Sequence, residues 1–193
     1  MENSGRKVII VGGLAGVGKT TVLNALYKRL EEQGKKFNVF VYGTVMLEEA
    51  MKLGIRDRDE IRKLPFEKQR ELQAMAAKRI SGEGIVFVDT HYIIPTPYGY
   101  LPGLPFHVLN ELKPTHLVLL LAEPQEIIRR RMNDPTRKRE AVSESEINYE
   151  ILLSRIMLGA ASALTGAMMI EVYNRENKVD AAVEELIKKL ELL

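Results

Sequence analysis

Short apolar runs alternate along the chain with longer stretches of helical periodicity. The apolar runs hold β-branched or large residues with little polar alternation, which is typical of strands covered on both faces. In one helical stretch, Val22, Leu23, Leu26 and Leu30 form a single apolar stripe and Gly34 ends the pattern. The expected strands are VIIV (8–11), FNVFVY (37–42), IVFVD (85–89), HLVLLL (116–121) and MMIEV (168–172).

This alternation of strands and helices predicts an α/β fold with a mainly parallel sheet and helices on both faces. It continues over residues 1–193 without a repeat or a linker, so a single domain is expected. One segment departs from it: THYIIPTPYGYLPGLPF (90–106) contains four prolines and two glycines. That composition predicts a long loop, and long loops inside compact domains are usually functional or disordered.

The composition and charge of the chain exclude several classes of protein. The chain has no cysteine, which excludes disulfides, thiolate metal sites and cysteine nucleophiles. No segment reaches the roughly 18 apolar residues of a membrane span, and the apolar start is too short for a signal peptide. We therefore expect a cytoplasmic protein that does not enter a membrane. The formal net charge of +2 argues against a general nucleic-acid binder.

The segment GLAGVGKT (13–20) matches the pattern G-x-x-x-x-G-K-[ST]. It follows an expected strand and opens an expected helix, which is the context of a P-loop. Glycines let the backbone curl and turn its N–H groups inward, and the helix N-terminus adds positive potential. Lys19 is expected to reach the β- and γ-phosphates of a nucleotide, and Thr20 to bind Mg²⁺. The expected nucleotide-binding residues are Gly13, Leu14, Ala15, Gly16, Val17, Gly18, Lys19, Thr20 and Thr21.

Asp89 ends an expected strand, where a carboxylate can hold Mg²⁺ through the water shell of the ion. The alternative is a turn residue that closes the strand. The predicted cofactors are thus ATP and Mg²⁺, with Thr20 and Asp89 on the metal side.

Three classes of P-loop protein compete: a GTPase switch, a kinase for a small metabolite and a nucleotide kinase. NKVD (177–180) fits the guanine-recognition pattern N-K-x-D, but no D-x-x-G follows any expected strand. Asp180 can also cap the last helix. A kinase is therefore favoured over a GTPase.

The stretch RRRMNDPTRKRE (129–140) places six basic side chains in twelve positions. A transferring phosphoryl group spreads negative charge over its oxygens, and a mobile basic segment can close over it. Arg137 and Arg139, two apart in an extended loop, can project to one side. We interpret residues 133–141 as a short lid; the alternative is a solvated charged hairpin.

The chain resembles the archaeal-type adenylate kinases over essentially its whole length. A single departure is visible, because Ala15 stands where the family often has proline, and this removes no phosphate donor. The resemblance rests on the P-loop, YGTVMLEEA (42–50), DRDEIRKLP (57–65), VDTHYIIPTPYGYLPGLP (88–105) and the lid segment NDPTRKRE (133–140).

The resemblance implies reversible phosphoryl transfer from ATP to AMP with Mg²⁺, giving two ADP. It implies a five-stranded parallel P-loop core, an AMP-binding segment at about 43–82 and a trimeric assembly. An AMP phosphate is already anionic at neutral pH and needs no general base. This agrees with the sequence, in which the only obvious candidate for a base, Asp89, already has a metal-linked role. For AMP the expected residues are Thr44, Val45, Met46, Arg58 and Arg62, and for catalysis Lys19, Arg131, Arg137, Arg139 and Arg155.

Three alternatives stay open at this level. Without the family, Arg58 and Arg62 read equally well as an exposed pair beside acidic neighbours. The acceptor could be another nucleoside monophosphate or a small metabolite, because the P-loop does not report acceptor choice. A regulatory or RNA-processing ATPase would instead hydrolyse ATP without an acceptor.

Overall fold

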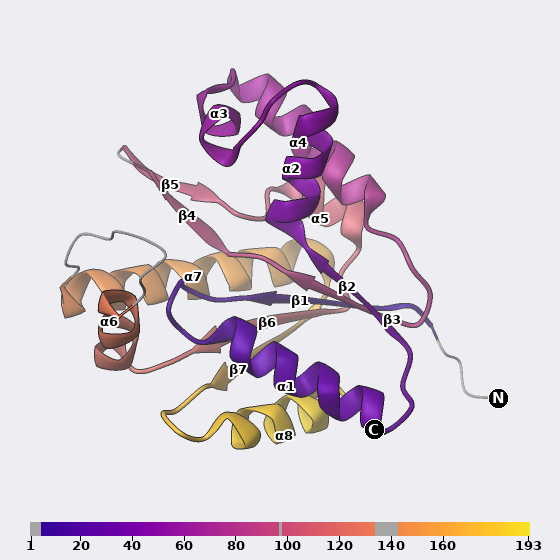
Figure 1. Cartoon of the computed structure of the whole chain (residues 1–193), viewed down its shortest axis with the longest axis vertical. Coiled ribbons are helices and arrows are strands. Elements are labelled where there is room, and N and C mark those ends of the chain that lie inside the picture. Colours follow the sequence, from indigo (N-terminus) through magenta and orange to yellow (C-terminus); the bar gives the residue numbers. More distant parts are fainter. Residues whose placement is uncertain (1–4, 97, 134–142) are drawn as a thin grey trace.

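A computed structural model describes residues 5–96, 98–133 and 143–193 of the chain. Its centre is a five-stranded parallel sheet in the order β2-β3-β1-β6-β7 (Figure 1). All five strands expected from the apolar runs are confirmed, with ends that shift by at most one residue. They are β1 (Lys7–Gly12), β2 (Phe37–Val41), β3 (Ile85–Asp89), β6 (His116–Leu121) and β7 (Met168–Tyr173).

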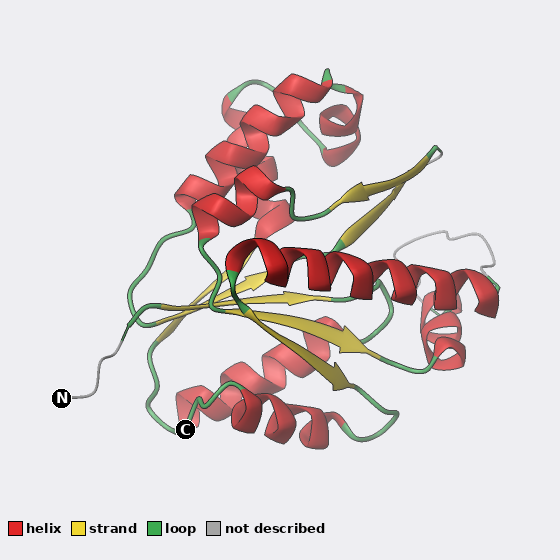
Figure 2. Ribbon diagram, turned by 180° about the vertical axis from the view of Figure 1, so that it is seen from behind, coloured by secondary structure: helices red, strands yellow, loops and turns green. Residues whose placement is uncertain are grey.

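Helices cover both faces of this sheet, as the continuous apolar strands require. Helices α1 (Lys19–Glu32) and α8 (Val179–Lys189) lie together on one face. The long helix α7 (Glu144–Thr165) crosses the other face, and α5 (Phe106–Leu112) contacts it (Figure 2). The apolar stripe predicted for α1 is buried in the main core.

Three helices form a smaller layer beyond the sheet: α2 (Tyr42–Lys52), α3 (Arg58–Lys63) and α4 (Phe66–Arg79) (Figure 1). They have a small core of their own, made by Ala50, Ile61 and Leu72. These helices occupy the segment 43–82, whose role in binding AMP stays a prediction.

The segment 90–106 is not the unstructured loop that its composition predicted. It contains an antiparallel hairpin of β4 (Ile93–Thr96) and β5 (Gly99–Pro102). Proline is tolerated here because a two-stranded hairpin consists of edge strands, which do not need every N–H. The Gly103 N–H donates to the Tyr92 carbonyl (2.9 Å) at the hairpin base, and a Cβ on Gly103 would overlap the His91 carbonyl.

The basic stretch begins on helix α6 (Pro124–Met132), which ends before Asn133. Helix α7 restarts the chain with a capping box, in which Ser143 and Glu146 satisfy each other's backbone N–H groups. Apart from Asn133, the predicted lid lies outside the described residues, and so do Arg137 and Arg139. Within the described ranges, no helix is long and apolar enough to cross a membrane.

Candidate active site

The P-loop lies at the carboxyl end of β1 and leads directly into α1. Gly16 (φ +93°) and Gly18 (φ +84°) have left-handed backbone conformations, which glycine adopts without the cost that a side chain adds. A side chain at Gly12 would overlap the ring of Tyr92, which lies buried with its hydroxyl donating to the Val118 carbonyl (3.2 Å). The dihedral angle therefore favours glycine at positions 16 and 18, and space requires it at position 12, the last residue of β1.

Lys19 forms an ion pair with Asp89 across the sheet edge, with 2.5 Å between Nζ and Oδ1. The pairing of β1 with β3 sets Val11 beside Asp89, so the two strand ends meet at the same edge. The side chains are only 11% and 15% exposed, respectively. The loop lysine and the strand-end carboxylate, predicted separately, thus form one polar centre.

The oxygen donors at this centre suit Mg²⁺. Thr20 lies exposed in the first turn of α1, and the Asp89 carboxylate adjoins the same loop. Mg²⁺ bound with substrate phosphates usually takes only one or two carboxylates from the protein. Among the described residues there is no cluster of three or more His, Cys, Asp or Glu side chains for a fully protein-bound metal.

The three consecutive arginines of α6 serve different partners. Arg129 pairs with Glu176 after β7 (2.5 Å). Arg130 donates to the Val17 carbonyl (3.2 Å) and more weakly to that of Gly16 (3.4 Å). Two of the three arginines therefore contact the P-loop, because Arg131 Nε donates to the Ala15 carbonyl (2.8 Å).

Arg131 was predicted to be catalytic, and the structure gives it two partners. Besides the P-loop, its Nη2 donates to the Glu150 carboxylate of α7 (3.1 Å), and both side chains are about nine-tenths buried. Here it joins α6, the P-loop and α7. A direct contact with a transferring phosphate stays a prediction.

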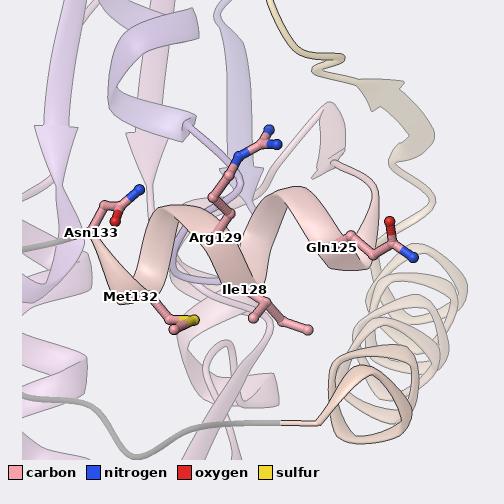
Figure 3. Close-up of a pocket in the computed structure, with 5 residues that line it drawn as sticks. All are labelled: Gln125, Ile128, Arg129, Met132 and Asn133. Atoms are coloured by element: carbon pink, nitrogen blue, oxygen red, sulfur yellow. The ribbon is translucent and has the colours of Figure 1, made fainter.

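A shallow pocket lies on the outer side of α6 (Figure 3). Ile128 and Met132, one turn apart, point to the same side, while Arg129 points away from them. Apart from Arg129, which is paired with Glu176, its lining is neutral, so phosphate chemistry belongs to the P-loop side of the helix. Its lining residues are Gln125, Ile128, Arg129, Met132 and Asn133.

Arg155 is held against β7. Its guanidinium donates twice to Glu171 (2.7 and 3.0 Å) and once to the Tyr173 hydroxyl (2.8 Å). The hydrogen bond to Glu171, followed by that to Tyr173, raises the pKa of Arg155 above its ordinary value. A catalytic role would require this arginine to exchange those partners for a phosphate.

The residues predicted for AMP lie on α2 and α3. Thr44 is exposed in the first turn of α2, whereas Val45 is buried in the main core and Met46 is half-buried between the two cores. Arg58 and Arg62 belong to α3, and their side chains lie outside the described part of the structure.

The family resemblance predicts residues 174–178 as a loop against the adenine of ATP, which stays a prediction, but sequence reasoning missed that Asn174 contacts the P-loop. Its side chain is buried and its Nδ2 donates to the Val17 carbonyl (2.8 Å). The available signal was its position directly after β7, since the carboxyl ends of parallel strands meet at the edge where the P-loop begins.

Comparisons with known proteins agree with this geometry. A family model described as an AAA domain matches residues 12–148. The adenylate kinase of Methanocaldococcus jannaschii is 43% identical over 188 residues, which covers 95% of this chain and 98% of that protein. The adenylate kinase of Saccharolobus solfataricus is 44% identical over 193 residues, covering 95% and 99%.

Solved structures share the fold at low identity. A shikimate kinase from Bacteroides thetaiotaomicron has a TM-score of 0.56 at 16% identity, covering 96% of this chain and 98% of that one. A gluconokinase from Sinorhizobium meliloti 1021 has a TM-score of 0.52 at 15% identity, covering 96% and 91%.

The parallel sheet, the P-loop and these neighbours define a protein of the P-loop kinase fold. The chain belongs to the AAA-domain family and to the adenylate kinases, which are phosphotransferases.

Proposed function

We propose that this protein catalyses the Mg²⁺-dependent, reversible transfer of the γ-phosphoryl group of ATP to AMP, which yields two ADP. The observation that carries the proposal is the P-loop cradle with its Lys19–Asp89 pair, in a chain that is 42–44% identical to curated adenylate kinases over nearly its whole length. The fold neighbours support the fold alone, because shikimate kinase and gluconokinase share at most 21% identity with this chain.

Phosphate binding in this proposal falls to residues 13–21. The inward N–H groups of the glycine-rich loop bind the phosphates of ATP, and the N-terminus of α1 favours their charge. Lys19 turns from Asp89 to the β- and γ-phosphates when the nucleotide binds. Thr20, and Asp89 through water, would hold Mg²⁺, which would neutralise charge that develops on the phosphate oxygens.

The acceptor needs positive charge more than it needs a base. Because an AMP phosphate is already ionised near neutral pH, no carboxylate has to remove a proton from it. Thr44, Val45 and Met46 receive the adenine of AMP on α2, and Arg58 and Arg62 of α3 hold its phosphate. Charge on the transferring group is stabilised by Arg131, Arg137, Arg139 and Arg155.

The protein acts in the cytoplasm as a homotrimer in this proposal. The support for assembly is an exposed apolar surface on α7 and on the edge strand β7. Leu152 (52% exposed) and Ile156 (55%) of α7 lie one turn apart, and Met168 and Met169 of β7 are about 60% exposed. Large apolar side chains exposed on a helix and on an edge strand mark an interaction surface.

The deciding experiment offers Mg·ATP with AMP, CMP, UMP, GMP or shikimate and follows ADP formation. AMP should react far faster than CMP or UMP. Lys19→Met is the matched blank for contaminating kinases. Comparable rates with all four monophosphates would refute the preference for AMP but leave a nucleotide kinase. ATP hydrolysis independent of any acceptor would instead identify an ATPase.

A further inference from the structure

Asn174 contacts the P-loop at the Val17 carbonyl. Its backbone N–H donates to the Leu121 carbonyl (2.7 Å), which extends the β6–β7 ladder by one residue and fixes its Cα. The residue is 3% exposed, and its Nδ2 donates to the Val17 carbonyl. A Cβ on Gly18 would collide with this same Nδ2. The amide thus lies directly against the peptide that joins Val17 to Gly18.

The orientation of that peptide decides where a phosphate donor points. In a planar trans peptide, the C=O and the N–H of one unit point in opposite directions. The Val17 carbonyl accepts hydrogen bonds from Asn174 and Arg130. The Gly18 N–H therefore points away from these two side chains. Gly18 has φ +84°, so this peptide orientation has little intrinsic preference and depends on what holds it.

The neighbouring peptides are held in the same way. From helix α6, Arg131 donates to the Ala15 carbonyl and Arg130 donates to the Gly16 carbonyl. Asn174 is the member of this group that comes from the sheet, and it is the member without charge. A neutral donor at this place orients the peptide by its hydrogen bond alone, whereas the two arginines also change the local potential.

We propose that Asn174 is a positioning residue for phosphoryl transfer, which holds the Val17–Gly18 peptide so that the Gly18 N–H faces the phosphates of ATP. The proposal rests on the proposed function. It assigns Asn174 no contact with substrate, because the buried amide donates to the P-loop backbone. Its effect passes through a preorganised donor, the kind of group whose loss costs about 10²–10³ in rate when it is removed outright.

The test uses Asn174→Asp and Asn174→Ala in the full chain. Aspartate has the shape of asparagine, but its carboxylate has no N–H to donate and repels the Val17 carbonyl. The Val17–Gly18 peptide is then no longer held with the Gly18 N–H in its original direction. We expect kcat to fall and the KM for ATP to rise, together by about 10- to 10²-fold in kcat/KM for ATP. The KM for AMP should stay unchanged. Alanine should produce a smaller shift in the same direction, and it decides the question should the aspartate variant not fold.

Asn38→Asp is the control for the substitution itself, at an exposed site. Asn38 lies on β2, and its amide donates to the Glu83 carbonyl (3.4 Å). Asn38 pairs with Val86 of β3, so it lies near the amino ends of the strands. The same substitution there removes the same kind of bond away from the P-loop. A purely structural role for Asn174 would lower the melting temperature and leave both kinetic constants unchanged. Folded Asn174 variants whose kcat and KM for ATP lie within twofold of the parent would overturn the proposal.

A failure of the proposed function is distinguishable from this result. A parent protein that forms no ADP from ATP and AMP would refute the function by itself. ATP binding measured by calorimetry would then still test Asn174, since both variants should bind ATP more weakly than the parent. Active parent and equally active variants would refute only the positioning role.

Discussion

Replacing Lys19 by methionine should remove both activity and part of the stability. If Lys19 were exposed, its substitution would be expected to change stability by less than about 0.5 kcal/mol, as most surface substitutions do. In the structure, however, its ammonium lies 2.5 Å from Asp89 and only 11% of the side chain is exposed. Lys19→Met leaves the Asp89 carboxylate, 15% exposed, without its cation.

The size of the stability loss follows from this burial. Hydrogen bonds to charged groups contribute about 1.5–3 kcal/mol, and breaking a fully buried pair costs about 3–5 kcal/mol. Since both side chains keep some contact with water, we expect a loss of about 2 kcal/mol. For a domain of 193 residues this corresponds to a fall in Tm of about 4–8 °C.

A double-mutant cycle separates the pair from its surroundings. Asp89→Asn removes the carboxylate charge, so Lys19→Met combined with Asp89→Asn should regain about 1 kcal/mol or more relative to additivity. Activity should not return, because the phosphates still lack the lysine; kcat should remain on the order of 10²-fold or more below the parent. Thermal melts without nucleotide and steady-state kinetics measure the two effects independently.

Lys28→Met provides the reference. Lys28 is exposed on the same helix, so this change should leave Tm and kcat near the parent values. A Lys19→Met protein that melted together with Lys28→Met, or a cycle that proved additive, would contradict the reasoning about the ion pair. Full activity in Lys19→Met would contradict the assignment of the phosphate cradle itself.

Two further predictions concern other parts of the chain. Arg137→Ala and Arg139→Ala should each lower kcat by about 10- to 10³-fold with smaller changes in KM. Lys138→Ala should change neither constant much. Three similar, near-neutral variants in steady-state assays would favour a solvated hairpin. Gly103→Ala should lower the free energy of unfolding by about 1–3 kcal/mol, because the new Cβ would overlap the His91 carbonyl; a denaturant titration that gives the parent stability would show that the hairpin base adjusts freely.

The sequence by itself determined the features that depend on local pattern. The central strands β1, β3 and β6 contain the apolar runs VIIV, IVFV and LVLLL, and such runs can be buried on both faces whatever their neighbours are. The edge strands β2 and β7 each contain one polar residue, Asn38 and Glu171, and are more exposed. The P-loop is also local, because its glycines, lysine and helix start lie within eight consecutive residues. The end of α6 and the capping box at Ser143 follow from short-range chemistry in the same way.

Tertiary structure decided which distant residues meet at the P-loop. Lys19 and Asp89 are 70 positions apart, and they pair because the strand order puts β3 beside β1. Asn174 is 157 positions from Val17, and only the place of β7 beyond β6 brings it near. No local pattern encodes this order of strands. The arginines show the same limit: Arg130 and Arg131 read as one basic run, yet the packing of α6 turns both toward backbone carbonyls of the P-loop.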